Sequence, residues 1–404
     1  MTTKTKRSNL RLKAMVFAGV LSFSIPIACS ANAIDNGSNK TANQAVSIQA
    51  EETDLIFMGG SGTAEDPYQI STAEELDRVR DHLTENFILI SDIDLSEYEN
   101  WIPIGEFQPK LDKPEDAEVP KTEVAFSGTF DGNGHTVKNV NVNAPQSMAV
   151  GLFGCVTGTD DRAAYIKNLT VENVNVNGAF LVGGVVGLQF MNCTVEEISL
   201  RGENVVQGMQ GIGGIVGTSF DWIRNCDAAA DITVLGEGGA CAGIIAGGTT
   251  FSSISGCTAE GGSISAADNG IWGIGGICGA PYGAAEIADC EAKDVAIAVT
   301  GENNRLVGGL VGFAGTYQEG TNAKISDCKV SNVTIQVSDS TTCVGGILGG
   351  GKEESEDSDR MPGFKILDCE VSGSITGGAD FVGDVVGNEE GAVEIDCTGT
   401  MIDR

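Results

Sequence analysis

The sequence predicts an all-β solenoid, in which short strands stack in parallel coils along one axis. The main observation is a phrase of the form apolar-Gly-Gly-apolar-apolar-Gly that returns about every 30 to 38 residues, at 182–187, 212–217, 274–279, 307–312 and 344–349. Self-similarity at such a period is typical of repeat architectures, whose units bury their apolar faces against their neighbours. The chain has 56 glycines and 9 prolines, and its repeats are rich in Val, Ile and Thr, which favours strands joined by tight corners.

Asn, Asp and Gly mark the expected corners of each coil. When the repeats are aligned on Leu169, Cys193, Cys226, Cys257, Cys290, Cys328, Cys369 and Cys397, the preceding residue is always Asn, Asp or Gly. These residue types tolerate the left-handed backbone conformation of a sharp corner. A second corner is expected four residues later and a third at the Gly-Gly pair. Three corners imply three strands per coil.

The recurring cysteines are expected to form one column inside the solenoid. Alternate residues of a strand point to opposite sides, so Cys193, Cys226, Cys257, Cys290, Cys328 and Cys369 should stack about 4.8 Å apart. At an inward position, Cys acts as a small hydrophobic residue, and we expect buried free thiols. Disulfides between neighbouring coils are the alternative. The chain has no CxxC motif, so we expect no metal at the cysteines.

The N-terminus has the three parts of a secretory signal peptide. Five basic residues, an apolar run over 14–28 and a small-x-small site at Ala31-Asn32-Ala33 predict a signal over 1–33. A lipoprotein signal at Cys29 is an open alternative. Residues 34–54 are polar and read as a disordered leader. We expect the N-terminal cap and first strands over 55–125, and the β-helix repeats over 126–404.

A short helix is expected to cap the N-terminal end of the solenoid. Ser71 and Glu74 have the spacing of a capping box, and Leu76, Val79 and Leu83 follow on one face. A solenoid end exposes unpaired strand edges, which such a helix can cover.

Several motifs in the first half resemble one family. The DPYxIxTxxEL opening (66–76), the DIDL strand (92–95), WxPIG (101–105), FSGTFDGNGHT (126–136) and GLFG (151–154) together resemble bacterial secreted proteins that carry the GLUG motif. The resemblance implies a right-handed parallel β-helix, like that of pectate lyases. It also implies a structural role for His135 in the GNGHT turn.

The charge of the chain limits its partners. Removing the signal leaves 19 basic against 56 acidic groups, a net charge of about −37. Such a charge repels phosphate backbones and anionic lipid, so we expect no nucleic acid partner. No segment after the signal has the roughly 20 apolar residues that span a bilayer, so no membrane insertion is expected.

We find no constellation of residues that predicts catalysis. Asp289, Asp327, Asp368 and Asp396 form a second column, which could attract Ca²⁺ but is better explained by the backbone preference of Asp at corners. His82 and His135 are the two histidines, and the acidic run over 353–359 reads as a solvated loop. We therefore assign no catalytic, cofactor or metal residue.

Loop aromatics are the candidate binding residues. They are Phe220, Trp222, Trp272, Tyr282, Phe313 and Tyr317, and their alternative role is packing within loops. The function expected is that of a secreted or surface-associated, non-catalytic, adhesin-like protein that binds glycans or extracellular proteins through loops on one face. The alternative is an extracellular polysaccharide lyase or glycosidase. Oligomeric state, ligand and surface attachment do not follow from the sequence.

Overall fold

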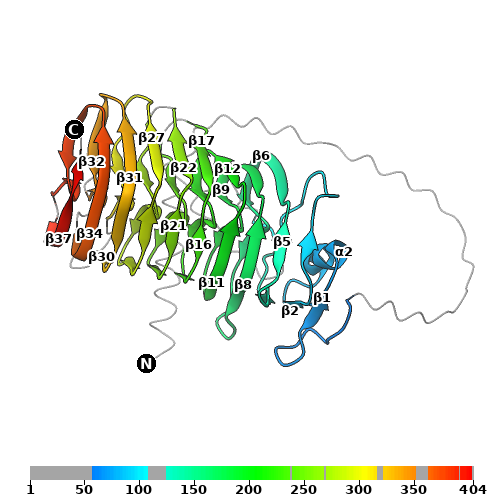
Figure 1. The fold of residues 1–404 in the computed structure, drawn as a ribbon. Helices are drawn as coiled ribbons and strands as arrows, with labels where there is room; N and C mark the ends of the chain where they lie inside the picture. The colour runs from blue at the N-terminus through cyan, green and yellow to red at the C-terminus, as the bar shows by residue number, and fades with distance from the viewer. Residues whose placement is uncertain are drawn as a thin grey trace, which may run out of the picture.

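A computed structural model describes residues 57–107, 124–236, 239–267, 270–315, 322–351, 363–390 and 392–402. The expected signal peptide and leader lie outside these residues. In the described part the chain forms parallel coils stacked along one axis (Figure 1). The predicted all-β class and parallel β-helix are confirmed.

Each coil begins with a strand that pairs in parallel with its counterparts in the neighbouring coils. This first column contains β1 (Tyr68–Ile70), β2 (Asn86–Leu89), β4 (Thr129–Asp131), β8 (Ala164–Glu172), β11 (Cys193–Arg201), β15 (Trp222–Arg224), β20 (Ser253–Ser255), β25 (Glu286–Ala288), β30 (Ala323–Ser326), β34 (Phe364–Thr376) and β37 (Ala392–Ile402). The second column, after the first corner, contains β3 (Ile93–Asp94), β5 (Thr136–Lys138), β16 (Asp227–Ala228), β21 (Thr258–Glu260), β26 (Glu291–Lys293) and the start of β31 (Lys329–Val337), together with the later parts of β8, β11 and β34.

Two more columns complete the large sheet. The third contains β6 (Asn141–Val150), β9 (Asn175–Gly183), β12 (Val205–Gly208), β17 (Asp231–Val234), β22 (Ser263–Ala266), β27 (Ala296–Val299) and the ends of β31 and β34. The fourth contains β13 (Gln210–Gly213), β18 (Cys241–Gly243), β23 (Gly273–Gly275), β28 (Leu306–Gly308), β32 (Thr341–Gly345) and β35 (Ala379–Gly383).

A separate eight-stranded sheet closes each coil. It contains β7 (Phe153–Val156), β10 (Val186–Gln189), β14 (Val216–Ser219), β19 (Ala246–Thr250), β24 (Cys278–Tyr282), β29 (Val311–Phe313), β33 (Leu348–Gly350) and β36 (Val386–Asn388). The coil over 222–250 is thus divided into five strand segments, from β15 to β19, a finer division than the three strands expected. Two of the breaks fall at residues 225–226, where Asn225 has a left-handed backbone, and at residues 229–230.

The corners expected at Asn and Asp have left-handed backbones. Asn225, Asp289, Asp327 and Asp368, each just before a cysteine, have φ between 51° and 55°. The second corner is left-handed at Asn173, Gly261, Asp294 and Asn332, which confirms the corner chemistry. Ala230, where the second corner was also expected, does not have a positive φ in the structure.

The prediction of a left-handed corner at the Gly-Gly pairs is wrong. Neither Gly308 nor Gly309 has a positive φ. Instead, a Cβ on Gly308 would lie 1.9 Å from the carbonyl oxygen of Val311, and one on Gly309 would lie 2.1 Å from that of Gly346. Glycine is needed here because backbones approach too closely for any side chain.

One regular column of β-branched residues shows how the interior is filled. Val142, Val176, Val206, Ile232, Ile264, Ile297, Ile335 and Ile375 are register partners through the third column, and all are buried. Such residues pack well on a pleated surface, and each covers its neighbour in the next coil.

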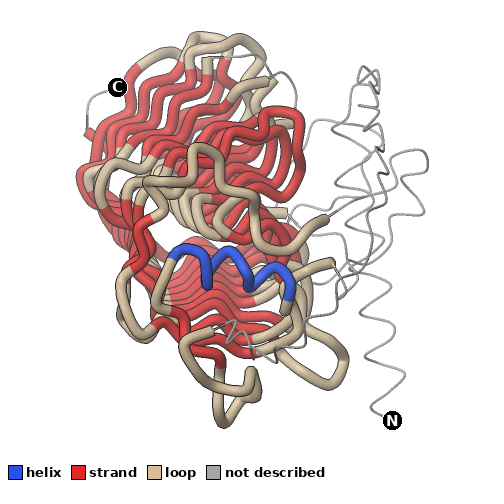
Figure 2. Tube along the Cα trace, turned by 90° about the vertical axis from the view of Figure 1, so that its right-hand side faces the viewer, coloured by secondary structure: helices blue, strands red, loops and turns tan. Residues whose placement is uncertain are grey.

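Helix α2 (Ala73–Asp77), continued by the 3-10 turn η1 (Arg78–Asp81), lies across the N-terminal end of the stack (Figure 2). The expected capping box is shifted by one residue, because Thr72 is the N-cap and Glu75 its partner. Ser71 also contacts the Glu75 carboxylate, with a distance of 2.9 Å from its Oγ. Leu76 and Val79 are fully buried as expected, and Leu83 packs against the core.

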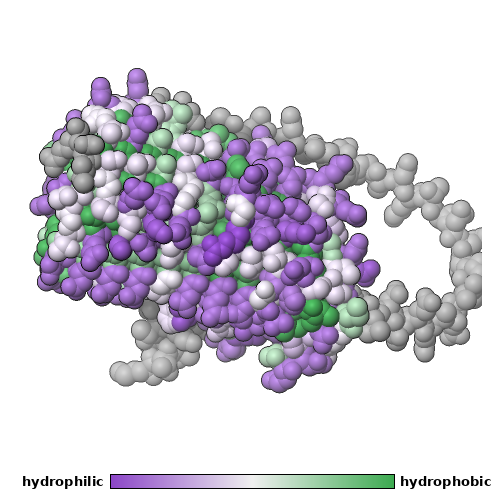
Figure 3. All heavy atoms as spheres, viewed as in Figure 1, coloured by the Kyte–Doolittle hydropathy of each residue, from purple (hydrophilic) through white to green (hydrophobic). Residues whose placement is uncertain are grey.

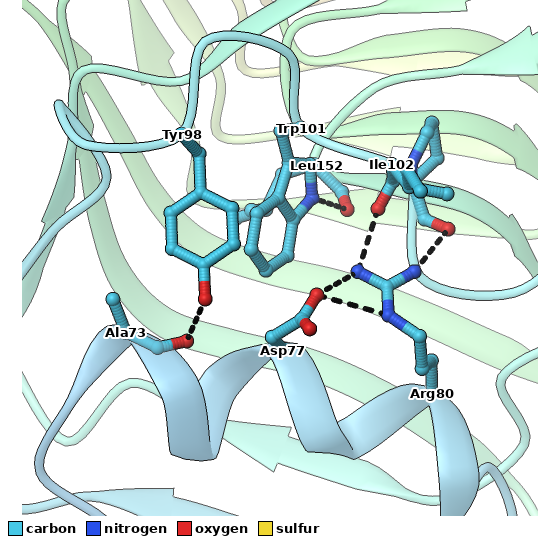
Figure 4. Close-up of polar contacts among 8 residues, drawn as sticks. Ala73, Asp77, Arg80, Tyr98, Trp101, Ile102 and Leu152 are labelled. Atoms are coloured by element: carbon cyan, nitrogen blue, oxygen red, sulfur yellow. Dashed lines mark hydrogen bonds and ion pairs between the residues drawn. The ribbon is translucent and has the colours of Figure 1, made fainter.

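The WxPIG motif holds this helix in place (Figure 4). The buried Trp101 donates from Nε1 to the carbonyl of Leu152 at 3.1 Å. Arg80 lies 5.2 Å from the Trp101 ring centroid and donates to the Ile102 carbonyl at 3.0 Å, while it also pairs with Asp77. The motif therefore ties α2 to the first coils through aromatic and backbone contacts.

Candidate functional site

The cysteine column exists, but Cys193 does not belong to it. Ile198 pairs with Leu169, and Ser199, the next residue, pairs with Asp227, so Ile198 occupies the rung below Cys226. Cys193 lies five residues earlier and pairs with Ala164. The column therefore runs Leu169, Ile198, Cys226, Cys257, Cys290, Cys328, Cys369 and Cys397.

The described cysteines have free thiols, ten of them buried, with Cys397 partly exposed. In the column, the cysteines from Cys226 to Cys397 follow one another in register, and the backbone N–H of Cys328 donates to the Sγ of Cys369 at 3.4 Å. Each thiol from Cys226 to Cys369 donates to the carbonyl two residues before it, as in the 3.1 Å contact of Cys226 with Arg224. Burial raises the pKa of the Cys226 thiol, and it also raises those of Cys155 and Cys278 outside the column. These three thiols are thus held in the protonated, poorly nucleophilic form.

The aspartate column lies on the outer surface at the first corner. Asp289, Asp327, Asp368 and Asp396 are all exposed, and the first three have left-handed backbones. Across the described residues no group of three or more His, Cys, Asp or Glu side chains is arranged to hold a metal ion. The backbone conformation accounts for Asp at these corners.

Both histidines make local contacts near the N-terminal end. His135 Nδ1 lies 3.2 Å from Asp92 Oδ1, and the backbone N–H of Thr136 donates to the same oxygen at 3.0 Å. This amide, followed by His135, lowers the pKa of the Asp92 carboxyl. His82 Nδ1 lies 3.0 Å from Glu85 Oε2. The His135 contact joins two segments 43 residues apart, whereas the His82 contact lies within one turn of the chain.

Most of the candidate aromatic residues are packing residues. Phe220 is fully buried against Phe190, and Trp272, Tyr282 and Phe313 form a cluster with ring centroids 4.8 to 5.3 Å apart. Tyr317 lies outside the described residues.

Trp222 is the exposed member of the predicted set. Its side chain, at the start of β15, is 49% exposed, and the Arg224 guanidinium lies 4.3 Å from the centroid of its ring. A partly exposed cation on an aromatic face contributes about 0.5–1 kcal/mol.

The charged residues of the outer surface pair across the rungs of the first two columns. Lys324 Nζ lies 2.9 Å from Glu286 Oε1, and Lys365 Nζ lies 3.1 Å from Glu394 Oε2. Lys293 pairs in the same way with Glu260, which raises the pKa of the lysine. Exposed pairs of this kind contribute little to stability because water screens them, and they neutralise charge locally. Hydrophilic residues predominate on the side seen in Figure 3, with pale and green residues between them.

The third column presents a different outer surface, which we name the amide–hydroxyl face. Its side chains form two rows in register along the axis. The first row is Asn141, Asn175, Val205, Asp231, Ser263, Ala296, Thr334 and Ser374, and the second is Asn143, Asn177, Gln207, Thr233, Ser265, Ala298, Gln336 and Thr376. Asp231 is the one ionisable residue in the two rows. All sixteen positions are exposed or partly exposed.

Side chains of this face bond one another along the axis. Asn175 Nδ2 donates to Asn141 Oδ1 at 2.9 Å, and Asn177 Nδ2 donates to Asn143 Oδ1 at 3.2 Å. Ser263 Oγ donates to Asp231 Oδ1 at 2.7 Å, which partly satisfies the one carboxylate. These contacts hold the polar groups in a regular array.

Comparison with known proteins supports the fold and its repeats. Residues 303–336 match the family model of the GLUG motif, so the chain carries this motif in the coil that contains β28, β29 and β31. A solved structure of a proposed immunoglobulin A1 protease from Bacteroides ovatus superposes with a TM-score of 0.50 and 20% identity over 80% of each chain. At this identity the likeness concerns the fold.

Two sequence relatives are much longer than this chain. Halomucin from Haloquadratum walsbyi is 30% identical over 210 residues, which are 50% of this chain and 2% of halomucin. A proposed Gly-rich membrane protein from Evansella cellulosilytica is 33% identical over 142 residues, 33% of this chain and 14% of that protein. Within the described residues, no helix has the length and apolar character needed to cross a membrane.

Proposed function

We propose that this chain is a secreted or surface-associated, non-catalytic β-helix protein that binds glycans or extracellular proteins in the manner of an adhesin. The observation that carries the proposal is the regular outer surface of the rod. Its charges are distributed into rung-to-rung pairs such as Glu286–Lys324, and its polar side chains form two rows in register, interrupted at Val205, Ala296 and Ala298. Repeated surfaces of this type suit binding to extended partners.

The relatives support an extracellular setting. One is named a halomucin and another a Gly-rich membrane protein, and both are matched by this chain over a small part of their length. The signal peptide predicted over residues 1–33 agrees with export, and the net charge near −37 of the predicted mature chain favours solubility at a surface. Fold alone does not decide function, so these arguments rest on sequence and surface chemistry.

A screen of the mature protein on arrays of glycans and extracellular matrix proteins tests the proposal. We expect saturable binding to at least one class of ligand. No binding on either array would contradict it.

The same protein should be incubated with pectate, alginate and glycosaminoglycans, with and without Ca²⁺. We expect neither unsaturated products nor new reducing ends, because the net charge near −37 of the mature chain repels these polyanionic substrates. Sustained turnover that one surface substitution abolishes would favour the alternative, a polysaccharide lyase or glycosidase.

A further inference from the structure

The amide–hydroxyl face differs from the adjoining face of the same coils in its charge. In the second column, every rung from β5 to β34 carries an outward charged side chain: Lys138, Glu172, Arg201, Asp227, Glu260, Glu291, Lys329 and Glu370. On the amide–hydroxyl face, Asp231 alone is charged. The whole chain has 56 acidic and 24 basic residues, so a nearly uncharged face along the rod requires an explanation.

We propose that the amide–hydroxyl face binds an uncharged, hydroxyl-rich polysaccharide that lies along the axis of the rod. The inference rests on the proposed function and specifies the ligand class and the surface for it. It places the site on strand side chains instead of on the loops.

The chemistry of the rows fits such a ligand. Asn and Gln side chains each offer donors and an acceptor, and Ser and Thr hydroxyls do both, which matches the mixed donor and acceptor character of sugar hydroxyls. Neutral polar groups lose less hydration free energy on contact than ions do. A face of amides and hydroxyls can therefore exchange hydrogen bonds with water for hydrogen bonds with sugar at a small cost in desolvation free energy.

The geometry also fits an extended polymer. The rows repeat at the strand spacing of about 4.8 Å, and the buried Val and Ile residues between them make the platform rigid. A rigid array loses little entropy on binding, and weak contacts repeated along one chain add to a useful total affinity.

The negative charge of the protein favours the binding of neutral polysaccharides over acidic ones. The field of a chain with net charge near −37 repels a polyanion, and the face offers no Lys or Arg to compensate. A neutral polysaccharide meets no such repulsion, so we expect it to be preferred.

A matched pair of double variants tests the proposal. Ser265→Glu with Ala298→Lys places a charged pair on two adjacent rungs of the face. Ser255→Glu with Ala288→Lys places the same pair on the first column of the same coils, because Ser255 and Ala288 are also register partners. All four positions are outward, and the opposite charges can pair as they do elsewhere on the rod.

The readout is migration of the mature, full-length protein in native gels that contain dextran, mannan or soluble cellulose derivatives without charge, compared with gels that contain pectate or alginate. We expect at least one neutral polymer to retard the wild type and the Ser255/Ala288 variant. The Ser265/Ala298 variant should bind about tenfold more weakly, as the loss of a few hydrogen bonds implies. Thermal unfolding of each variant confirms that the fold is retained.

The proposal would be overturned by equal retardation of both variants, by stronger retardation in the acidic polymers, or by no retardation in any neutral polymer. In the first two cases, the protein still binds a glycan, so the proposed function survives while the assigned surface or ligand class fails. Binding to gelatin or fibronectin on a matrix-protein array, with no retardation by polysaccharides, would instead indicate a protein partner.

Discussion

A Cβ atom on Gly309 would lie 2.1 Å from the carbonyl oxygen of Gly346, which occupies the equivalent position in the next coil. The same relationship joins Gly276 to Gly309, at 2.4 Å, and Gly184 to Gly214, at 2.4 Å. The second glycine of each repeated phrase thus allows successive coils to approach. This contact explains why the phrase recurs along the chain.

Gly309→Ala is expected to be strongly destabilising, by about 3 kcal/mol, because the new methyl group would force two backbones apart. Gly248→Ala is the matched control, since a Cβ there meets nothing closer than the Ala280 carbonyl at 3.5 Å and Gly248 has no positive φ. Denaturant unfolding of the two variants measures the difference. Equal midpoints would contradict the close approach at Gly309.

The repeats could be predicted from the sequence because corners and close approaches both demand particular residue types. The sequence could not show, however, which structural constraint requires glycine at a given position. A left-handed backbone and a close contact select the same residue, and the structure shows close contact at Gly308 and Gly309. The distance between successive coils decides which of the two constraints applies, and no local sequence pattern indicates that distance.

The misplacement of Cys193 has a similar origin. Asn192 has a left-handed backbone, as Asn225 does, but it lies at a different corner, between β10 and β11. The true counterpart of Asn225 in that coil is Glu197, which has φ of 55° although Glu rarely adopts this conformation. The Asn-Cys pair at 192–193 therefore marks a different corner from the Asn-Cys pair at 225–226, with which the sequence alignment had matched it. Knowledge of strand register was also needed to recognise the amide–hydroxyl face.

The column thiols should resist alkylation in the native protein. Cys257, Cys290 and Cys328 are buried, and the mature chain should expose Cys397 alone to a small reagent at neutral pH. After denaturation without reductant, all described cysteines should react. Mass spectrometry of labelled peptides measures this, and few reactive thiols in the denatured sample would show that the column contains disulfides.

The stability of the fold should decrease in alkaline solution. Burial raises the pKa of the Cys278 thiol above its ordinary value of about 9, so above this pH the unfolded chain loses a proton that the folded chain keeps. The contribution of this thiol to stability is therefore complete below about pH 9 and is lost as the pH rises further. Melting temperatures between pH 7 and pH 10 should fall, and Cys278→Ala should reduce the slope. An unchanged slope would argue against a perturbed thiol.

Glu197→Asn should stabilise the protein by about 1 kcal/mol, because Asn tolerates the left-handed conformation that costs other residues roughly 1–2 kcal/mol. The side chain of Glu197 is exposed, so the substitution removes little packing. Glu196→Asn is the control, since the backbone of Glu196 itself is not left-handed and Asn has a lower strand propensity there. Chemical denaturation should place the Glu197 variant above the wild type and the Glu196 variant at or below it. The reverse order would show that this corner is misassigned, and with it the rung that puts Ile198 below Cys226.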